Sequence, residues 1–484
     1  MHYKEKLSRE QLMVISYDAM IAHENAVRLI DLVCRKFFVG QPFNEKWKGN
    51  KHEGRKSYPP DSMLKLLVYG YFNGIASSRK LERETYRNIE MIWLMEGLQP
   101  DHWTICDFRR ESGTIMKDFL RSFRKFLIDN NYATTDKVVF DGTKVKAYAK
   151  REMLTVESIG EKLENIDKSI SEYLSKLENN DQHDEELATA KSEIQELKEK
   201  IRKLESDKSK LEGAKRNIEK SGKKYYAPND TEAVMVKGRD GKFPGYNVQI
   251  GVEPKGHFII TDRVTTETND MQQLQDCVES FIEETGSVPK EVSADKGYSN
   301  TTQILEIEKN DKTKCYIPLI ETKREMQEKE GVTFKYNAEG DTYTCSQGKQ
   351  LLLLSRNHKN KGAYYNIYKC HGCEGCNIRA KCTKSKTGRI VKRNVDQEKI
   401  DQYKERIAGE YAKEKIRERK TVVEHPFGTI KMLMGKFNLL LKGKTKVQTE
   451  FDYYTAAYNL KRLIGCACVS DLVINMENCR LKIA

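Results

Sequence analysis

Apolar residues recur at every third or fourth position through the first 131 residues of the chain, and this spacing predicts helices. One such run consists of Met63, Leu66, Leu67 and Tyr71. Residues 100–104 interrupt the pattern, and a short basic helix with Arg109 and Arg110 follows them. Two helices around a tight break indicate either ordinary helical packing or a helix-turn-helix that reads DNA.

A second periodic region, residues 155–215, alternates apolar spacings of four and three, which is the heptad pattern of a coiled coil. The first arm carries Ile159, Leu163, Ile166, Ile170, Tyr173 and Leu177, and the second carries Leu187, Ala190, Ile194, Leu197, Ile201, Leu204 and Leu211. The polar residues 178–184 form a plausible turn between them. We therefore expect an antiparallel coiled-coil hairpin with arms of about 35–40 Å. The alternative is one continuous helix that pairs with a second molecule.

Five short apolar segments after residue 131 predict the strands of a mixed α/β sheet. They span residues 137–142, 245–252, 257–261, 291–294 and 314–318. Asp141 and Asp295 end the first and fourth segments, and a glycine shortly after each lets the chain turn away from a ligand-bearing sheet edge. Read alone, either aspartate is more often a turn or capping residue. A late helical stretch, from about residue 397, carries Glu424.

The charge balance bears on possible partners. Lys plus Arg number 85 against 72 Asp plus Glu, which gives a formal net charge of +13 over 484 residues. This excess favours a polyanionic partner through counterion release, and on charge alone a merely soluble basic surface fits equally well. No window approaches the roughly 18 consecutive apolar residues of a membrane span, and residues 1–12 lack the apolar core of a signal peptide. We expect a cytoplasmic protein without a membrane partner.

Five of the 12 cysteines crowd into one region, at Cys345, Cys370, Cys373, Cys376 and Cys382. Thiolates at C-x2-C spacing, with glycines that allow tight knuckles, predict a tetrahedral Zn²⁺ site. An iron–sulfur cluster is the main alternative, but the fourth cysteine does not arrive at the ferredoxin spacing. Five thiols exceed the four places of one zinc, so Cys345 or Cys370 is a candidate spare. Free buried cysteines are the remaining alternative. Basic residues between 381 and 393 would either grip DNA phosphates or form a solvated rim.

Three strings around the carboxylates resemble the signature blocks of bacterial insertion-sequence transposases of the DDE superfamily. They are FDGTK around Asp141, ADKGY around Asp295 and VEHPFGTIK around Glu424. Residues 244–249 and 457–462 resemble flanking blocks of the same group, in the same order. Residues 58–110 resemble the InsH-like N-terminal domain that accompanies this core.

The resemblance implies an RNase H-like core in which Asp141, Asp295 and Glu424 hold two Mg²⁺ or Mn²⁺ ions, with Asp141 bridging them. It also implies a transposase that binds terminal inverted repeats of double-stranded DNA, cleaves at the element ends and joins them to target DNA. Such an enzyme works as a homodimer or larger synaptic assembly, in the cytoplasm of a bacterium and associated with its nucleoid.

The residues expected to contact DNA are Lys144, Arg109, Arg110, Lys420 and Lys431. Lys420 departs from the family, in which an arginine commonly stands four residues before the glutamate. Because a lysine is a point charge, bidentate phosphate recognition would be lost there. Lys431, seven residues after Glu424, matches the family's lysine.

The expected plan is a catalytic core interrupted by two insertions. The core comprises residues 132–154, 216–330 and 396–484, after a helical DNA-binding domain in residues 1–131; the helical hairpin spans residues 155–215 and a zinc-binding, β-rich insertion residues 331–395. Two other functions compete with transposition. One is a non-catalytic DNA-binding protein derived from a transposon. The other is a structure-selective nuclease with the same core, which would hydrolyse DNA without joining ends.

Overall fold

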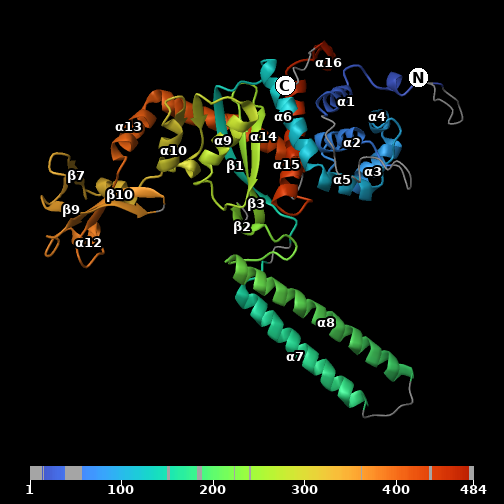
Figure 1. The fold of residues 1–484 in the computed structure, drawn as a ribbon, viewed down its shortest axis with the longest axis horizontal. Helices are drawn as coiled ribbons and strands as arrows, with labels where there is room; N and C mark the ends of the chain where they lie inside the picture. Colours follow the sequence, from blue (N-terminus) through green and yellow to red (C-terminus); the bar gives the residue numbers. More distant parts are fainter. Residues whose placement is uncertain are drawn as a thin grey trace, which may run out of the picture.

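The computed structural model describes residues 14, 16–38, 57–149, 153–181, 188–222, 224–238, 241–360, 362–434 and 439–478. A group of N-terminal helices packs beside a central sheet, a long helical hairpin projects from the body, and a second sheet lies at the opposite end from the N-terminal helices (Figure 1). None of the helices within these ranges is long and apolar enough to cross a membrane.

Helices make up the regular structure of the described residues before residue 131, as predicted. They are η1 (Asp18–Met20), α1 (Ala26–Phe37), α2 (Pro60–Phe72), α3 (Ser78–Arg87), α4 (Ile89–Leu94), α5 (His102–Glu111) and α6 (Gly113–Asp129). Helix α2 begins at Pro60, where a missing N–H leaves no helical bond unmade, and Asp61 in its first turn suits the helix dipole. Residues 1–13, which include the whole segment examined for a signal peptide, lie outside the described residues.

The central sheet has six strands and mixes parallel with antiparallel pairing, so the mixed α/β prediction is confirmed. The strands are β1 (Lys137–Lys146), β2 (Val234–Gly238), β3 (Gly241–Val252), β4 (Ile259–Thr265), β5 (Glu291–Ser293) and β6 (Lys314–Tyr316). Their order is β2-β3-β1-β5-β6, and β4 pairs with β3. Strand β3 is antiparallel to β1, β2 and β4, whereas β1, β5 and β6 run parallel to one another.

Helix α15 (Lys444–Ile464) joins the N-terminal helices to this sheet. Its Tyr453 stacks on Tyr71 of α2 at 5.2 Å, and Tyr454 meets the same ring edge-on at 4.6 Å. On its other side, the Asn459 side chain exchanges two 2.9 Å hydrogen bonds with the backbone of Ile259 in β4. One continuous hydrophobic core therefore runs from the N-terminal helices into the sheet. The last helix, α16 (Val469–Asn478), packs against α1.

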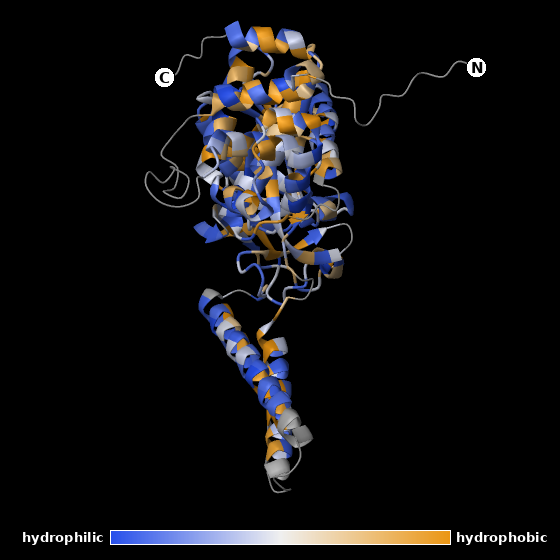
Figure 2. Cartoon of the chain, turned by 90° about the vertical axis from the view of Figure 1, so that its right-hand side faces the viewer, coloured by the Kyte–Doolittle hydropathy of each residue, from blue (hydrophilic) through white to orange (hydrophobic). Residues whose placement is uncertain are grey.

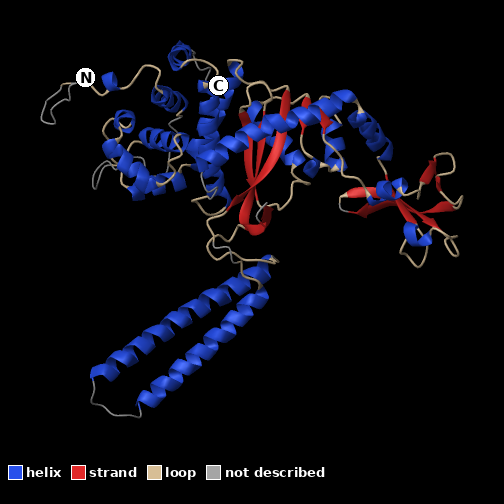
Figure 3. Ribbon diagram, turned by 180° about the vertical axis from the view of Figure 1, so that it is seen from behind, coloured by secondary structure: helices blue, strands red, loops and turns tan. Residues whose placement is uncertain are grey.

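The predicted helical hairpin consists of α7 (Val156–Asp181) and α8 (Ala188–Ser221), which lie side by side away from the body (Figures 1 and 3). Ile159 is buried with Ala214 and Ile218 at the base. Lys208 pairs with Asp167 at 2.6 Å, a contact that one continuous helix would not allow. Hydrophilic residues predominate along both arms, with hydrophobic residues interspersed among them (Figure 2). A heptad seam between the arms stays a prediction, and residues 182–187, with part of the predicted turn, lie outside the described residues.

A second, antiparallel sheet forms the predicted β-rich insertion (Figure 3). Its strands are β7 (Phe334–Asn337), β8 (Thr342–Cys345), β9 (Gln350–Asn360), β10 (Ala363–Cys370) and β11 (Ile390–Asn394), in the order β11-β10-β9-β8-β7. Helix α11 (Lys323–Lys329) precedes the sheet and α12 (Arg379–Cys382) lies between its last two strands. The sheet has a small core of its own, built on Phe334, Tyr343, Leu351 and Tyr368.

The remaining helices are α9 (Leu274–Thr285), the 3-10 turn η3 (Lys296–Tyr298), α10 (Thr301–Glu308), α13 (Gln397–Ala408) and α14 (Glu410–Met434). Helices α9, α10 and α14 pack against the central sheet, and α13 packs against α10 and α14. The late helical stretch is thus two helices with a break at Gly409. Pro426 lies inside α14 and does not end it, although a proline removes one helical hydrogen bond.

Candidate active site

Asp141 and Asp295 come from neighbouring parallel strands. In the ladder between β1 and β5, Val139 lies opposite Ser293, and each aspartate follows two residues later in its own chain segment. Parallel strands in register carry such residues to the same edge of the sheet. The charge of Asp295 acts on the pKa of Asp141, as expected of near neighbours. Two of the three predicted carboxylates are therefore brought together.

Gly142 has a different role from the predicted one. Strand β1 does not end at Asp141 but continues to Lys146, paired with β3 throughout. A Cβ on Gly142 would lie 2.5 Å from Nε2 of Gln249 and 2.9 Å from Oδ1 of Asp270. Glycine is required here because other side chains approach the strand closely, not because the chain turns.

The Asp141 carboxyl lies in an environment that disfavours its charge. Burial raises its pKa from 3.8 to about 6, the Arg419 guanidinium and the Gly142 N–H oppose this increase, and the charges of Asp295 and Asp270 add to it. Nη1 of Arg419 lies 3.8 Å from Oδ2 of Asp141, and the Asp141 side chain is 23% exposed. A perturbed carboxyl among other carboxylates is typical of a functional site.

Asp295 caps the short turn η3. Its Oδ1 accepts the N–H of Gly297 at 2.7 Å, so the capping role considered from the sequence is present. The cap uses one oxygen, and an ionised carboxylate has further lone pairs for a ligand. Tyr298, in the same turn, is fully buried and donates its hydroxyl hydrogen bond to Oε1 of Gln249.

Asp270 is a third carboxylate near the pair, and it was not among the residues predicted from sequence. It precedes α9 and accepts hydrogen bonds from Asn247 and Gln249, each at 2.7 Å to Oδ1, and from Lys144 at 3.1 Å. No motif or periodicity marks this position, because its importance comes from strands that lie far away in the sequence. Only the pairing of β1 with β3 places its partners together.

Glu424 is not joined to the two aspartates. It lies exposed on α14, the helix that brings Arg419 to Asp141. Glu424 follows Arg419 by five positions, which turns the two side chains about 140° apart around a helix with 3.6 residues per turn. Within the described ranges, no three His, Cys, Asp or Glu side chains are arranged as a ready metal site. The predicted trio is thus assembled only in part.

The predicted DNA contacts divide into buried and exposed residues. Arg109 is 2% exposed and donates to the backbone oxygen of Ala76 at 2.6 Å, so its predicted phosphate contact does not fit this structure. Lys144 is paired with Asp270. Arg110 pairs with Asp107 at 2.8 Å but remains 45% exposed. The two lysines of α14, Lys420 and Lys431, are both exposed.

The five clustered cysteines line one small cavity in the insertion, together with Phe334, Leu351 and Arg389. All five are free thiols, and Sγ of Cys373 accepts the backbone N–H of Arg389 at 3.3 Å. Burial raises the pKa of Cys382, and the neighbouring thiols Cys373, Cys345 and Cys376 add to the increase. The sequence cluster is therefore also a spatial one, although no three of the thiols are poised as metal ligands among the described residues.

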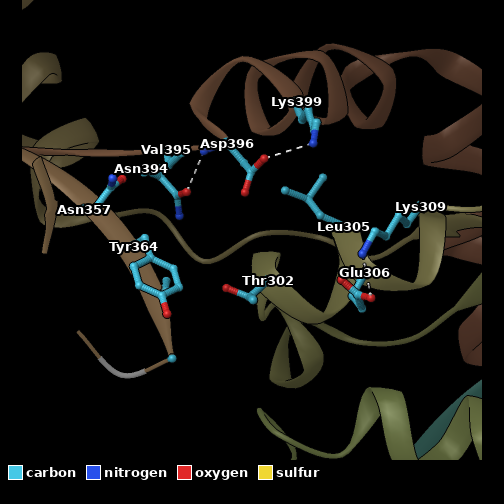
Figure 4. Close-up of a pocket in the computed structure, with 12 residues that line it drawn as sticks. Thr302, Leu305, Glu306, Lys309, Asn357, Tyr364, Asn394, Val395, Asp396 and Lys399 are labelled. Atoms are coloured by element: carbon cyan, nitrogen blue, oxygen red, sulfur yellow. Dashed lines mark hydrogen bonds and ion pairs between the residues drawn. The ribbon is translucent and has the colours of Figure 1, made fainter. Parts of the chain in front are cut away.

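A cleft of about 610 Å³ lies where the insertion meets the core, between α10, α13 and one end of strands β9, β10 and β11 (Figure 4). Its two carboxylates, Glu306 and Asp396, are paired with Lys309 and Lys399 at 3.3 and 3.0 Å. Neither Asp141 nor Asp295 lines it. The cleft is thus separate from the carboxylate pair.

Two regions of the chain match known protein families. Residues 15–111 match the family described as Transposase domain (DUF772), and residues 344–464 match the family described as Transposase DDE domain. The resemblance to DDE transposases is confirmed. The second match includes Glu424, the cysteine cluster and the tail block, whereas Asp141 and Asp295 lie between the matched regions.

The DDE transposase resemblance has little support from individual proteins. No curated protein sequence matches the chain. A cryo-EM structure of a piggyBac transposase synaptic complex with hairpin DNA aligns over 92% of this chain and 79% of that chain, with 10% sequence identity and a TM-score of 0.33. A TM-score this low does not establish a shared fold.

Proposed function

We propose that this chain is a DNA transposase with an RNase H-like core, which cleaves phosphodiester bonds at the ends of its element and joins those ends to target DNA. The observation that carries the proposal is the position of Asp141 and Asp295, each two residues beyond the last paired residue of two neighbouring parallel strands, in a chain whose flanking regions match transposase domains. The raised pKa of Asp141 supports the proposal, because a site that destabilises the ionised form of a carboxyl favours the binding of a cation.

The donor chemistry of this edge fits Mg²⁺ or Mn²⁺, which prefer carboxylate oxygens. In the proposal Asp141 and Asp295 hold the metal and Glu424 completes the set. When bound, two such ions would supply the chemistry that activates a water or 3′ hydroxyl and offsets charge on the leaving oxygen. The Arg419 guanidinium now occupies one side of Asp141. We therefore propose that activation of the enzyme includes a shift of α14 that moves the Arg419 side chain away from Asp141 and brings the Glu424 side chain to its place.

The proposed DNA surface uses exposed cations near the glutamate helix and the N-terminal helices. Lys420 and Lys431 flank Glu424 on α14, and Arg110 lies in the last turn of α5. The net charge of +13 agrees with a polyanionic partner. We propose terminal inverted repeats as the bound sequence. Since two element ends must be held together, we also propose a dimer or larger assembly.

The test uses the full-length protein, a duplex carrying the inverted repeat that flanks the gene, Mg²⁺ and a supercoiled target. The parent should nick the duplex and yield joined products, whereas Asp141→Ala and Asp295→Ala should yield neither. Asp276→Ala serves as the control, because Asp276 pairs with Arg263 on the surface of α9 and lies outside the site.

Three results would contradict this proposal. Cleavage by Asp141→Ala at the parental rate would remove the catalytic assignment. Hydrolysis without joined products would favour a structure-selective nuclease. Binding of the repeat without cleavage under any divalent ion would favour a non-catalytic DNA-binding protein.

We also propose that the cysteine cluster binds one Zn²⁺. The convergence of five free thiols on one cavity supports it, since thiolates are the preferred ligands of structural zinc. Metal analysis of the purified chain should find one zinc per chain, and Cys373→Ser with Cys376→Ser should lose it. Iron with visible absorption would favour the iron–sulfur alternative, and a protein without either metal would overturn both.

A further inference from the structure

The side-chain amide of Gln249 is the centre of a buried polar chain behind the carboxylate pair. Its Nε2 donates to Oδ1 of Asp270 at 2.7 Å and to Oδ1 of Asn247 at 2.9 Å. Its Oε1 accepts the hydroxyl of Tyr298. Gln249 is 1% exposed, so water cannot reach its amide, and these side chains supply the hydrogen-bond partners that a buried amide requires.

Asp270 fixes the orientation of that amide. A glutamine amide can flip, exchanging its donor and acceptor ends. The carboxylate of Asp270 accepts only, so it holds Nε2 toward itself and thereby points Oε1 toward Tyr298. Asp270 also holds Lys144 through both carboxylate oxygens, at 3.1 and 3.3 Å.

Two glycines show how closely this chain approaches the catalytic edge. A Cβ on Gly142, the residue after Asp141, would collide with both Gln249 and Asp270. A Cβ on Gly297 would lie 2.7 Å from Oδ1 of Asp295 and 3.7 Å from Cβ of Asp270. Asp270 therefore lies against the turn that presents Asp295. Since successive strand residues point to opposite faces, it meets β1 on the face opposite the Asp141 side chain.

We propose that Asp270 is a positioning residue for Asp295. It orients the Gln249 amide, Gln249 holds the buried Tyr298, and Tyr298 fixes the turn whose first residue is Asp295. This inference rests on the proposed function for its consequence in catalysis. Groups that orient the ligands of a metal site influence both metal affinity and rate, commonly by about 10–100-fold.

The experiment measures Mn²⁺ binding to the full-length protein by calorimetry, and the single-turnover cleavage rate at saturating end DNA. Asp270→Ala should weaken Mn²⁺ binding and lower the rate, each by about 10-fold or more, with unchanged affinity for the DNA. Tyr298→Phe removes the hydroxyl at the far end of the same chain and should act in the same direction. Asp276→Asn, on the neighbouring helix, is the matched control and should behave as the parent.

A double variant separates positioning from a general loss of structure. Because Asp270 and Tyr298 act through one amide, Asp270→Ala with Tyr298→Phe should be no worse than the worse single variant. Fully additive losses would overturn the proposal, as would parental Mn²⁺ binding in Asp270→Ala. Asp270→Asn as inactive as Asp141→Asn would also overturn it, in favour of direct contact with the metal.

The positioning role of Asp270 and the proposed transposase function can fail independently of each other. If the parent cleaves no end DNA, transposition fails as the function, and the Mn²⁺ measurements on Asp270→Ala, Tyr298→Phe and Asp276→Asn still decide whether Asp270 positions the site. If the parent cleaves and these variants bind Mn²⁺ as it does, only the positioning role fails.

Discussion

Replacing Asp141 with asparagine should stabilise the fold at neutral pH while abolishing cleavage. The carboxyl is only 23% exposed, and burial with the nearby Asp295 and Asp270 outweighs the attraction of Arg419. Its ionised form therefore costs folding free energy. Asparagine has nearly the same shape and carries no charge, so it removes that cost together with the metal ligand.

The size of the effect follows from the pKa of Asp141, which rises from 3.8 to about 6 on folding. One pKa unit corresponds to 1.36 kcal/mol, so ionised Asp141 costs about 3 kcal/mol above pH 6. A carboxyl with a raised pKa contributes its full stability below about pH 4 and loses it as the pH rises through 6. The advantage of Asp141→Asn should thus be complete at pH 7.5, about halved at pH 5 and absent below about pH 4.

Thermal unfolding in EDTA measures this difference across the pH range. In domains of 150–250 residues, 1 kcal/mol moves the Tm by about 2–4 °C, and a longer chain moves less, so Asp141→Asn should melt a few degrees higher at pH 7.5. Added Mg²⁺ should raise the Tm of the parent but not of the variant. Equal melting at pH 7.5, or a difference that persists unchanged at pH 4, would refute the buried-charge argument.

Two further substitutions test packing around the site and the fate of a predicted DNA contact. Gly142→Ala should destabilise the chain by about 1–3 kcal/mol through overpacking against Gln249 and Asp270. Gly160→Ala, at a helix position with nothing within 4 Å of its Cβ, should instead stabilise the chain by about 0.5–1 kcal/mol. Urea unfolding compares the two variants, and equal effects on the free energy of unfolding would contradict the close approach at Gly142. Arg109→Ala should cost about 3–5 kcal/mol, because it leaves the buried Glu450 without its nearby cation. Arg110→Ala should cost at most about 1 kcal/mol, and a stable Arg109→Ala that binds DNA weakly would restore Arg109 as a contact.

Sequence pattern predicted the elements well where they are long or periodic. The helical hairpin and the mixed sheet could be inferred from spacing, because amphipathic faces have to be buried, whereas the β-rich insertion was expected from the family resemblance. Strand β1 was predicted too short, since Gly142 looks like a turn residue when its neighbours on β3 are unknown. The break at Gly409 was missed for a similar reason: tertiary packing overrides local propensity.

The carboxylate pair could be predicted from motifs, but its surroundings could not. Asp141 and Asp295 end apolar segments that the ladder brings into register. Asp270 and Arg419 have no such mark, because each is defined by a contact across the fold. Arg109 shows the converse case. A basic helix end predicted a DNA contact, yet only the packing of α5 against α2 and α15 reveals that this arginine is buried.

The long gaps between the three carboxylates are compatible with one core because each insertion leaves and returns at nearly the same place. Leu154 and Tyr226 exchange two 2.8 Å backbone hydrogen bonds at the base of the helical hairpin. At the second insertion, the Tyr403 hydroxyl bonds the backbone of Ile317, and Lys404 pairs with Glu325 at 2.7 Å. The cost of closing a loop grows only slowly with its length. Insertions whose two ends are held together therefore add little to the free-energy cost of forming the sheet. Asp141 and Asp295 can lie on adjacent strands although a hairpin separates them in sequence.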